Sequence, residues 1–360
     1  MLFESARFLD MPSRGLLALF AATMVTVLLC WFAVVDRYSR VGWSIIREED
    51  LIFPRFQHQM SGITDMEVAR ADGKFALSRS ENAWANTGLG GFPAVSSRVE
   101  SVLVAVAGMK YIAPKTKRSR LHHRLHVEDV TSTARSTRLT FKDGAGAVLA
   151  DVIIGKPKDT PDRPGVYVRL PGEDQVWLSE GVYDVRHDMV EWSDRVVANL
   201  DARFMRAITV SHPSRETVAL YRSQPQDRKM KLKNLPAGAA IEHQYQIDYM
   251  AGLLQDLDFI DARRAGRYPP MAAPAFRVVA HWNSQLVVTL HTDEPMPDGA
   301  VWARVEARVN DNSQASEFEK REAARIQSKF DGWIVKLPRK FTDRIEIRLD
   351  DIILSKAALQ

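Results

Sequence analysis

An uncharged apolar run near the N-terminus constrains this chain more than any other feature. Residues 15–35 read GLLALFAATMVTVLLCWFAVV, which is 21 residues without a charged side chain or a proline. At a rise of about 1.5 Å per residue, a helix of this length measures roughly 30 Å, the thickness of a bilayer's hydrocarbon core. The run therefore predicts a transmembrane anchor, formed by residues that include Gly15, Leu17, Phe20, Leu28, Trp31 and Val35.

A cleaved signal peptide and a lipoprotein anchor are the alternatives for this run. A signal peptide has a shorter apolar region and small residues at the −3 and −1 positions of its cleavage site. The run instead ends Trp31-Phe32-Ala33-Val34-Val35, without such a pattern. A lipidated cysteine follows a small residue, whereas Cys30 follows Leu29. Both comparisons favour an anchor that is retained in the mature protein.

The charges that flank the run leave its orientation undecided. Arg7 and Arg14 precede it, and Arg37, Arg40 and Arg47 follow it. The flank that is richer in Lys and Arg normally stays in the cytoplasm. Because the two flanks carry similar numbers of basic residues, charge alone predicts neither direction.

The composition is that of a globular protein. The chain is 46% hydrophobic and 26% charged, with a net charge of +4. Its basic residues are scattered, which argues against nucleic-acid binding. The single cysteine, Cys30, lies within the apolar run. The body therefore has no disulfide, no thiolate nucleophile and no cysteine metal site.

Short alternating segments joined by turn residues predict antiparallel hairpins from residue 51 onward. Asp72-Gly73 is a strong hairpin turn, because both residues tolerate a positive φ. Apolar spacing of three and four residues predicts amphipathic helices over 97–109 and 244–260, and a charged helix follows at 317–330. The predicted strands are 63–70, 74–79, 138–141, 147–155, 166–170, 175–179, 207–211, 217–222, 276–280, 286–291 and 301–309.

The order strand, turn, strand, helix recurs about 145 residues later. We therefore predict an α+β fold, in which the N-terminal transmembrane helix precedes two tandem modules of antiparallel hairpins with amphipathic helices. The recurrence suggests a duplication. The predicted parts are a cytoplasmic tail (1–14), the anchor (15–35), a juxtamembrane linker (36–50), two modules (51–203 and 204–354) and a C-terminal tail (355–360).

Several segments of the body carry a resemblance to a known family. They are Leu51–Pro54, Lys74–Trp84, Met109–Thr116, Leu139–Lys156, Tyr167–Leu178 and Glu191–Arg195. Together they resemble a bacterial family catalogued as domain of unknown function 4340, over roughly residues 50–340 and most closely over 65–200. The resemblance implies a single-span protein whose body lies outside the inner membrane. It also implies a neighbourhood of transporter components similar to gliding-motility ABC systems, and it supplies no catalytic residues.

Three histidines in the segment RLHHRLHVED are the best candidates for metal ligands. His122 and His126 are four residues apart, a spacing that places two side chains on one helix face, as in zinc sites. The segment lacks a His-Glu-x-x-His motif, and its many cations oppose a dication. We interpret it as a solvated basic surface and expect no cofactor. The same cations, among them Lys117 and Arg120, favour an anionic partner or a lipid headgroup as the alternative.

Tryptophans are the other candidates for binding. Most lie in or beside predicted strands, where aromatic side chains usually pack in the sheet core. Trp302 is the exception, because strand alternation places it on one face with Arg304, Glu306 and Arg308. These residues are candidates for contact with a partner or a sugar.

No Gly-x-Ser-x-Gly, Walker or Gly-x-Gly-x-x-Gly motif occurs in the chain. The function we expect is that of a non-enzymatic accessory protein in the bacterial inner membrane, with its N-terminus in the cytoplasm and its body in the periplasm. Its partners would be the bilayer, through residues 15–35, and proteins of an inner-membrane transport complex. An envelope glycan- or lipid-binding module is the alternative, and a metal-dependent enzyme is a remote one.

Overall fold

The structure is a computed structural model that describes residues 22–31, 51–80, 83–158, 164–181, 185, 188–214, 216–224, 226–233, 235–267 and 274–354. Of the predicted anchor residues, Gly15, Leu17, Phe20 and Val35 lie outside these ranges. The predicted linker and both predicted tails also lie outside them.

Residues 22–31 form a helix whose every residue is exposed. Its large apolar side chains, including Leu28 and Trp31, are between 51 and 68% exposed. Thr26 Oγ1 donates a hydrogen bond to the carbonyl oxygen of Ala22, at 2.9 Å. Among the residues that the structure describes, no helix combines the length and the apolar content needed to cross a membrane.

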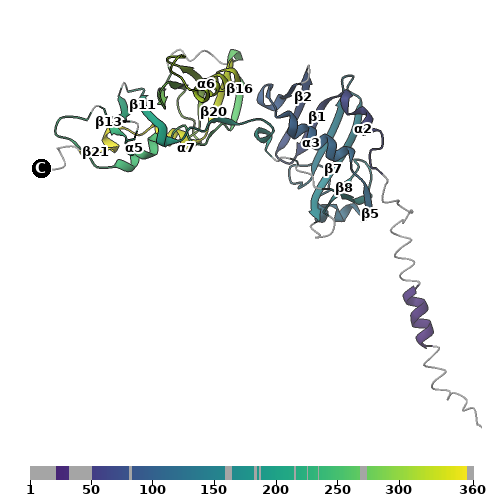
Figure 1. The fold of residues 1–360 in the computed structure, drawn as a ribbon. Coiled ribbons are helices and arrows are strands. Elements are labelled where there is room, and N and C mark those ends of the chain that lie inside the picture. The colour runs from purple at the N-terminus through teal and green to yellow at the C-terminus, as the bar shows by residue number, and fades with distance from the viewer. Residues whose placement is uncertain are drawn as a thin grey trace, which may run out of the picture. The chain divides into compact units, whose positions relative to one another are not determined.

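The remainder of the chain is an α+β structure built on antiparallel sheets (Figure 1), as the sequence predicted. Its contacts divide it into two compact units. The first unit comprises residues up to Lys74 together with Ser101–Asp184, and the second comprises Phe75–Glu100 together with residues from Val185 onward. The predicted modules were contiguous in sequence, whereas these units each draw on two separate segments.

The first unit contains six neighbouring antiparallel strands in the order β1-β6-β7-β8-β9-β5. The predicted hairpins are present: Phe141 pairs with Ala150 between β6 and β7, and Tyr167 pairs with Leu178 between β8 and β9. The elements are α2 (Phe56–Gln59), η1 (Met60–Gly62), β1 (Ile63–Arg70), β5 (Tyr111–Pro114), η3 (Ser119–Leu121), α4 (His122–Leu125), β6 (Thr137–Asp143), β7 (Val148–Lys158), β8 (Gly165–Arg169) and β9 (Val176–Glu180).

The boundaries between the units fall inside two elements of the chain, and the segment between these elements belongs to the second unit. They are β2 (Gly73–Ser80), which follows β1 after a two-residue turn, and α3 (Ser96–Ala107). Between them lie β3 (Ala83–Asn86), η2 (Thr87–Leu89) and β4 (Phe92–Pro93). Leu89 and Phe92 join the hydrophobic core of the second unit. This burial explains why the segment is grouped with residues far along the sequence.

The second unit is built on an eight-stranded antiparallel sheet in the order β13-β12-β11-β17-β18-β19-β20-β16. Its strands are β11 (Met205–Ser211), β12 (Thr217–Tyr221), β13 (Lys231–Leu232), β16 (Asp261–Arg264), β17 (Phe276–Trp282), β18 (Leu286–Thr292), β19 (Val301–Val309) and β20 (Trp333–Leu337). Two small sheets pair β10 (Val196–Ala198) with β15 (Leu257–Asp258), and β14 (Ala240–Ile241) with β21 (Ile353–Leu354).

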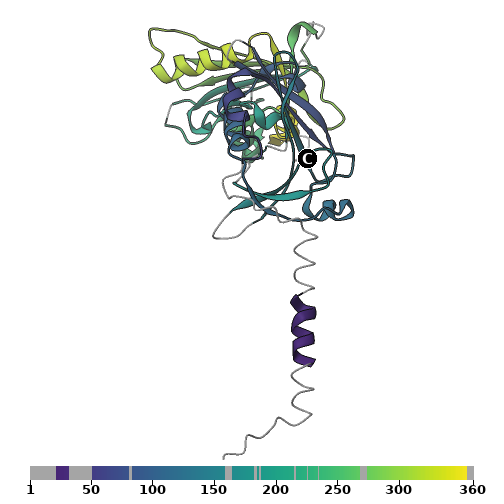
Figure 2. The ribbon, with the colours of Figure 1, turned by 90° about the vertical axis from the view of Figure 1, so that its right-hand side faces the viewer.

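The helices of the second unit contribute apolar side chains to the same core. Ile247 of α5 (Gln244–Ala251), Ile326 of α6 (Glu317–Phe330) and Phe341 of α7 (Arg339–Ile345) all belong to it. The long yellow-green helix in Figure 2 is α6, which has the bounds that the sequence predicted. Short 3₁₀ turns complete the unit: η4 (Met189–Trp192), η5 (Ala202–Phe204), η6 (Ala265–Arg267) and η7 (Leu349–Asp351).

The helix predicted over 244–260 is wrong in its second half, because α5 ends at Ala251. Gly252 follows at the C-cap, and Asp256 has a φ of +49°, a left-handed conformation that no helix continues. Leu257 then pairs with Ala198 in a short strand. The apolar spacing that suggested a longer helix therefore reflects burial of a turn and a strand.

The two units share one order of connections. In the first, β1 is followed through α3 by β5, and then by the consecutive strands β6 to β9. In the second, β11 is followed through α5 by β16, and then by β17 to β20. In each sheet the strand after the helix forms the edge beside the last strand, as β5 beside β9 and β16 beside β20. The first unit has only a turn where the second inserts α6, between β19 and β20.

Candidate binding surfaces

The basic segment of the first unit, residues 115–124, follows the edge strand β5. It is fixed to the unit by its own buried contacts and by those of the residues that come directly after it. His122 is 5% exposed, and its Nε2 lies 3.0 Å from the carbonyl oxygen of Asp174. Val127 is fully buried in a small apolar cluster with Ile153 and Val176. A Cβ on Gly155 would lie 2.3 Å from the carbonyl oxygen of Leu125, so glycine permits this close approach.

Arg169 binds the residues that come directly after this segment. Its side chain is 4% exposed, and its Nε donates to the carbonyl oxygen of Val127 at 2.7 Å. Nη1 donates to the carbonyl oxygen of Glu173 at 3.0 Å, and Nη2 pairs with Asp129 at 2.5 Å. A buried guanidinium that donates to three acceptors therefore joins Val127 and Asp129, directly after the segment, to the turn between β8 and β9.

The expectation that His122 and His126 share a helix face is wrong. The helix α4 ends at Leu125, and His126 caps it with a left-handed φ of +57°. Burial lowers the pKa of His126, and the nearby Arg135 and Lys156 lower it further, although Glu128 opposes them. Within the ranges that the structure describes, no group of three or more His, Cys, Asp or Glu side chains is placed to hold a metal ion.

The cations of the basic segment point to solvent. Lys117, Arg118, Arg120 and Arg124 are all exposed. None of the four forms an ion pair with any residue that the structure describes. The segment thus combines a buried side with exposed cations that form no ion pair within the part of the chain that the structure describes.

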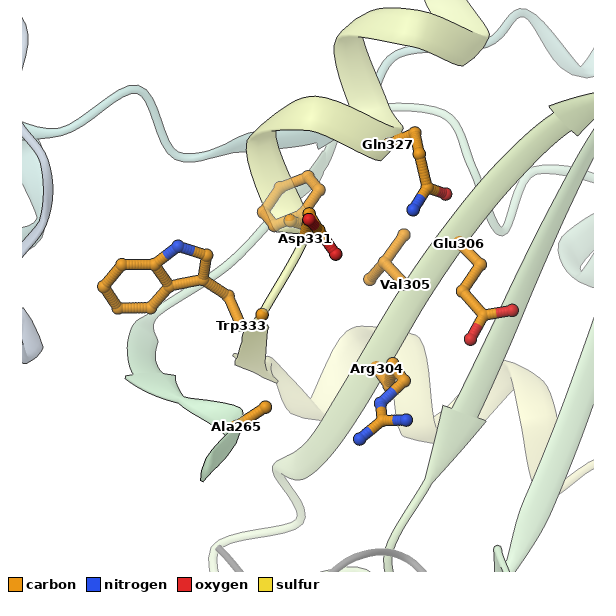
Figure 3. Close-up of a pocket in the computed structure, with 9 residues that line it drawn as sticks. Ala265, Arg304, Val305, Glu306, Gln327, Asp331 and Trp333 are labelled. Atoms are coloured by element: carbon orange, nitrogen blue, oxygen red, sulfur yellow. The ribbon is translucent and has the colours of Figure 1, made fainter. Parts of the chain in front are cut away.

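A pocket of about 340 Å³ lies in the second unit, between β19 and the end of α6. Figure 3 shows Arg304, Val305 and Glu306 on the strand, with Gln327 projecting from the helix. Gly332 has a φ of +71°, which allows the tight turn from α6 into β20. The lining residues are Ala265, Arg304, Val305, Glu306, Gln327, Phe330, Asp331, Gly332 and Trp333.

The walls of this pocket are held by specific contacts. Gln327 Oε1 accepts a hydrogen bond from the backbone N–H of Ala307 at 3.2 Å, which joins α6 to β19. The guanidinium of Arg264 lies 4.0 Å from the centre of the Trp333 ring. Trp333 is 5% exposed, so its ring forms a wall more than an open platform.

Trp302 and Arg304, the two residues of β19 that the sequence identified as binding candidates, differ in their exposure to solvent. Arg304 is exposed and lines the pocket. Trp302 is only 5% exposed, and the guanidinium of Arg263 lies 4.4 Å from its ring centre. The cation covers one face of the indole, and with 5% of the residue exposed little of the ring is open to a stacking sugar.

The segment Glu191–Arg195, one of those that carry the family resemblance, has a structural role in the second unit. Trp192 is fully buried, and Arg98 donates to the carbonyl oxygens of Glu191 and Ser193. Asp194 pairs with Lys329 of α6 at 2.7 Å. The segment thus binds both α3 and α6 to the unit.

Sequence reasoning missed the pocket because its residues come from three separate stretches. Arg304 and Glu306 were recognised on one strand, but Gln327 and Asp331 lie on the predicted charged helix and its end, where polar side chains are ordinary. A signal was present in Asp331-Gly332-Trp333, because glycine between a helix and an aromatic strand predicts a sharp return of the chain. This pattern predicts that the helix ends directly before the strand that begins at Trp333.

Fold and surfaces define a β-rich α+β protein with antiparallel sheets. A family model described as Domain of unknown function (DUF4340) matches residues 84–269, just over half of the 360-residue chain, and the protein belongs to this family. The resemblance drawn from the sequence is thereby confirmed, over a narrower range than residues 50–340. No curated protein and no solved structure matches the chain.

Proposed function

We propose that the protein is a membrane-anchored, non-enzymatic accessory subunit of a bacterial envelope complex. Its body lies on the periplasmic side of the inner membrane, and its partners are components of an ABC transport system of the gliding-motility type. The single observation that carries the proposal is the helix at 22–31, whose large apolar side chains are between 51 and 68% exposed.

An exposed apolar helix is unfavourable in water, because each large apolar side chain gains about 1.5–3 kcal/mol when it leaves water. A helix that is apolar on all sides is normally buried in a protein core or in a membrane. The helix lies inside a 21-residue apolar run that is long enough to span a bilayer. The bilayer is therefore the environment in which this segment is stable.

The family resemblance supports the partners and the orientation. It implies a body outside the inner membrane and a neighbourhood of gliding-motility-like transporter components. The two units offer extended antiparallel sheets, which suit a subunit that presents surface to other proteins.

Purification from membranes tests this proposal. The full chain, tagged at its C-terminus and extracted in a mild detergent, should recover integral membrane subunits of an ABC transporter in fixed stoichiometry. The matched control fuses residues 1–50 to an unrelated soluble domain and should recover none of them. Recovery of the full chain alone, or equal recovery by both proteins, would contradict an accessory role of the body.

Envelope glycan binding at the pocket is a second candidate. Sugars are bound by aromatic side chains together with planar polar groups that form paired hydrogen bonds. The pocket offers Arg304, Glu306, Gln327 and Asp331 beside Trp333.

Glycan-array binding by the full chain in detergent should fall at least tenfold in Arg304→Ala. The control Arg277→Ala, an exposed arginine of β17 outside the pocket lining, should bind normally. Equal binding by both variants would exclude this pocket as the glycan site.

A further inference from the structure

We propose that the basic segment, residues 115–124, is a docking surface for the anionic phospholipid headgroups of the membrane in which the chain is anchored. This inference rests on the proposed anchor at residues 15–35, and it adds a second, electrostatic contact between the body and the bilayer. The ligand chemistry is the phosphate diester of lipids such as phosphatidylglycerol.

The positive charge of this surface is concentrated in a short stretch of the chain. Lys117, Arg118, Arg120 and Arg124 are exposed, and none is paired with a described residue. Lys115 adds a partly buried cation, whose pKa is lowered by burial and by the charge of Lys158. The acids next to the segment are Glu128, Asp129, Glu173 and Asp174. Glu128 accepts a hydrogen bond from the backbone N–H of Arg135, and Asp129 pairs with the side chain of Arg169. Glu173 and Asp174 are exposed in the turn that contacts His122.

The surface is also preorganised. The buried contact of His122 fixes the segment to the unit, and the contacts of Val127 with its apolar cluster and with Arg169 fix the residues directly after it. The exposed cations therefore project from a supported loop. A preorganised array of cations loses less side-chain and loop entropy on binding than a disordered basic tail. Arginine, which forms paired hydrogen bonds with phosphate oxygens, supplies three of the four exposed cations.

The chain enters the folded unit at the start of the strand that leads to this surface. Leu51 forms an isolated antiparallel bridge with Lys110, and the backbone N–H of Ile52 donates to the carbonyl oxygen of Met109 at 2.8 Å. From Lys110, β5 leads directly to Lys115, a distance of at most about 17 Å in extended backbone. The point at which the linker joins the unit and the start of the basic segment therefore lie at the two ends of one short strand.

The length of the linker keeps the surface within reach of the bilayer. The 15 residues 36–50 separate the apolar run from Leu51. Even fully extended, they reach at most about 50 Å. A tethered surface meets its target at a high effective concentration, so that weak individual contacts suffice for docking. Each Lys or Arg near an anionic membrane strengthens binding roughly fivefold at low salt.

Soluble anions of the envelope have no such tether. The headgroups of the chain's own membrane are a polyanionic surface that the proposed anchor holds within reach of the segment. This proximity selects the lipid as the partner among the ligands that unpaired cations favour.

Energy transfer in nanodiscs tests the inference with the full chain. Ser119→Cys in a Cys30→Ser background places a donor dye within the segment, and acceptor-labelled headgroups report its approach to the bilayer. Transfer should be higher in discs that contain phosphatidylglycerol than in discs of phosphatidylcholine alone. Added salt should remove the difference, because screening weakens exposed charge pairs.

Charge reversal supplies the decisive comparison. The variant Lys117→Glu, Arg118→Glu, Arg120→Glu and Arg124→Glu should give the phosphatidylcholine level of transfer in both kinds of disc. The matched control reverses four exposed cations of the second unit, Arg228, Lys229, Lys231 and Lys233, and should behave as the parent.

Three results would overturn the inference. Equal transfer in both lipids would show that the segment does not recognise anionic headgroups. A loss of transfer in the control as large as in the reversed variant would show an effect of net charge alone. Loss of a co-purifying protein in the reversed variant, with no lipid dependence, would assign the surface to a protein partner. Failure of the chain to enter discs at all would instead contradict the anchor itself, and so the proposed function.

Discussion

Glu319 shows how a single residue can hold two elements together in this protein. Its side chain caps the N-terminus of α6, where the hydroxyl of Ser316 donates to Oε2 at 2.8 Å. Oε1 accepts from the backbone N–H of Gln285 at 2.7 Å, in the turn between β17 and β18. The carboxylate is 1% exposed. It therefore serves both as a helix cap and as the acceptor for a neighbouring hairpin.

The ionisation of Glu319 follows from these contacts. Burial alone would raise its pKa, but the backbone donors of Gln285, Ser316 and Leu286 stabilise the charged form more strongly. The pKa of Glu319 is lowered from 4.5 to about 2. A shift of this size corresponds to roughly 3 kcal/mol of folding free energy. Because the folded pKa is the lower one, this stability is present above pH 4.5 and is lost as the pH falls toward 2.

We predict that Glu319→Gln lowers the free energy of unfolding by about 2 kcal/mol at neutral pH, because an amide replaces a charged acceptor. Urea unfolding followed by circular dichroism measures the difference, which should shrink as the pH drops below 4.5. The control Glu317→Gln changes an acid that is 79% exposed and should cost under about 0.5 kcal/mol. A pH-independent difference would refute the role given to the charge.

At the scale of single residues, the sequence identified candidate binding residues but did not predict which neighbours surround them in the fold. The spacing of His122 and His126 is that of a zinc site, yet a left-handed turn at His126 breaks the helix on which the prediction depended. Strand alternation correctly grouped Trp302 with Arg304, but it could not show that Arg263, from a strand 40 residues earlier, covers the indole. Such facts depend on contacts between distant segments, which local patterns do not encode.

At the scale of elements, the segment 75–100 is the part of the chain that local patterns placed least well. Its Phe92 is 1% exposed, and its ring centre lies 5.0 Å from that of Phe259 and 4.9 Å from that of Trp333. Both contacts are edge-to-face, an arrangement that adds about 0.5–1.5 kcal/mol to each pair. The segment is therefore part of the core of the second unit.

We predict that Phe92→Ala destabilises the second unit by about 3–5 kcal/mol, the usual cost of removing a buried phenyl ring. Hydrogen exchange should show that β16 and β20 lose protection, whereas β6 and β7 of the first unit keep theirs. Phe318→Ala, at a phenylalanine that is 47% exposed, is the matched control and should cost under about 1 kcal/mol. Loss of protection in β6 and β7 instead would contradict the assignment of Phe92 to the second unit.

The helix at 22–31 makes a separate prediction for the anchor. The double change Val25→Arg and Leu28→Arg should release much of the chain from membranes, because each arginine in the middle of a span costs about 3 kcal/mol. Fractionation after an alkaline wash measures the bound fraction. The control places arginines at Leu235 and Tyr245, which are exposed in the second unit, and should leave binding unchanged. Equal release of both variants would argue against an anchor in this helix.

Elements with strong local signals were predicted well. The hairpins of β6 with β7 and of β8 with β9 have clear turn residues, and α6 begins with Ser316 and Glu319 of a capping box. The helix α5 was predicted too long, because the buried strand that contains Leu257 continues its apolar pattern. Periodicity reports burial, and a short buried strand next to a helix is easily read as another turn of that helix.

At the scale of the whole molecule, the two units repeat one order of connections, and each places its edge strand after a helix. In the first unit the loop after that edge strand carries the basic segment, and in the second the edge strand itself, β16, supplies the arginines that cover Trp302 and Trp333. The shared order of connections is the one that a duplication of a single module would produce, and the duplication stays a prediction. The sequence could suggest the recurrence from element order, but only strand pairing shows that the edge strands correspond.

The topology of the chain in its membrane tests the central claim most directly. A reporter enzyme that is active only in the periplasm is fused to the C-terminus of the full chain and expressed in bacteria, beside a matched fusion to a reporter that fluoresces only in the cytoplasm. An anchored subunit with its body outside the inner membrane predicts activity of the periplasmic reporter in the membrane fraction and no signal from the cytoplasmic one. Cytoplasmic fluorescence, or periplasmic activity in the soluble fraction, would contradict the account.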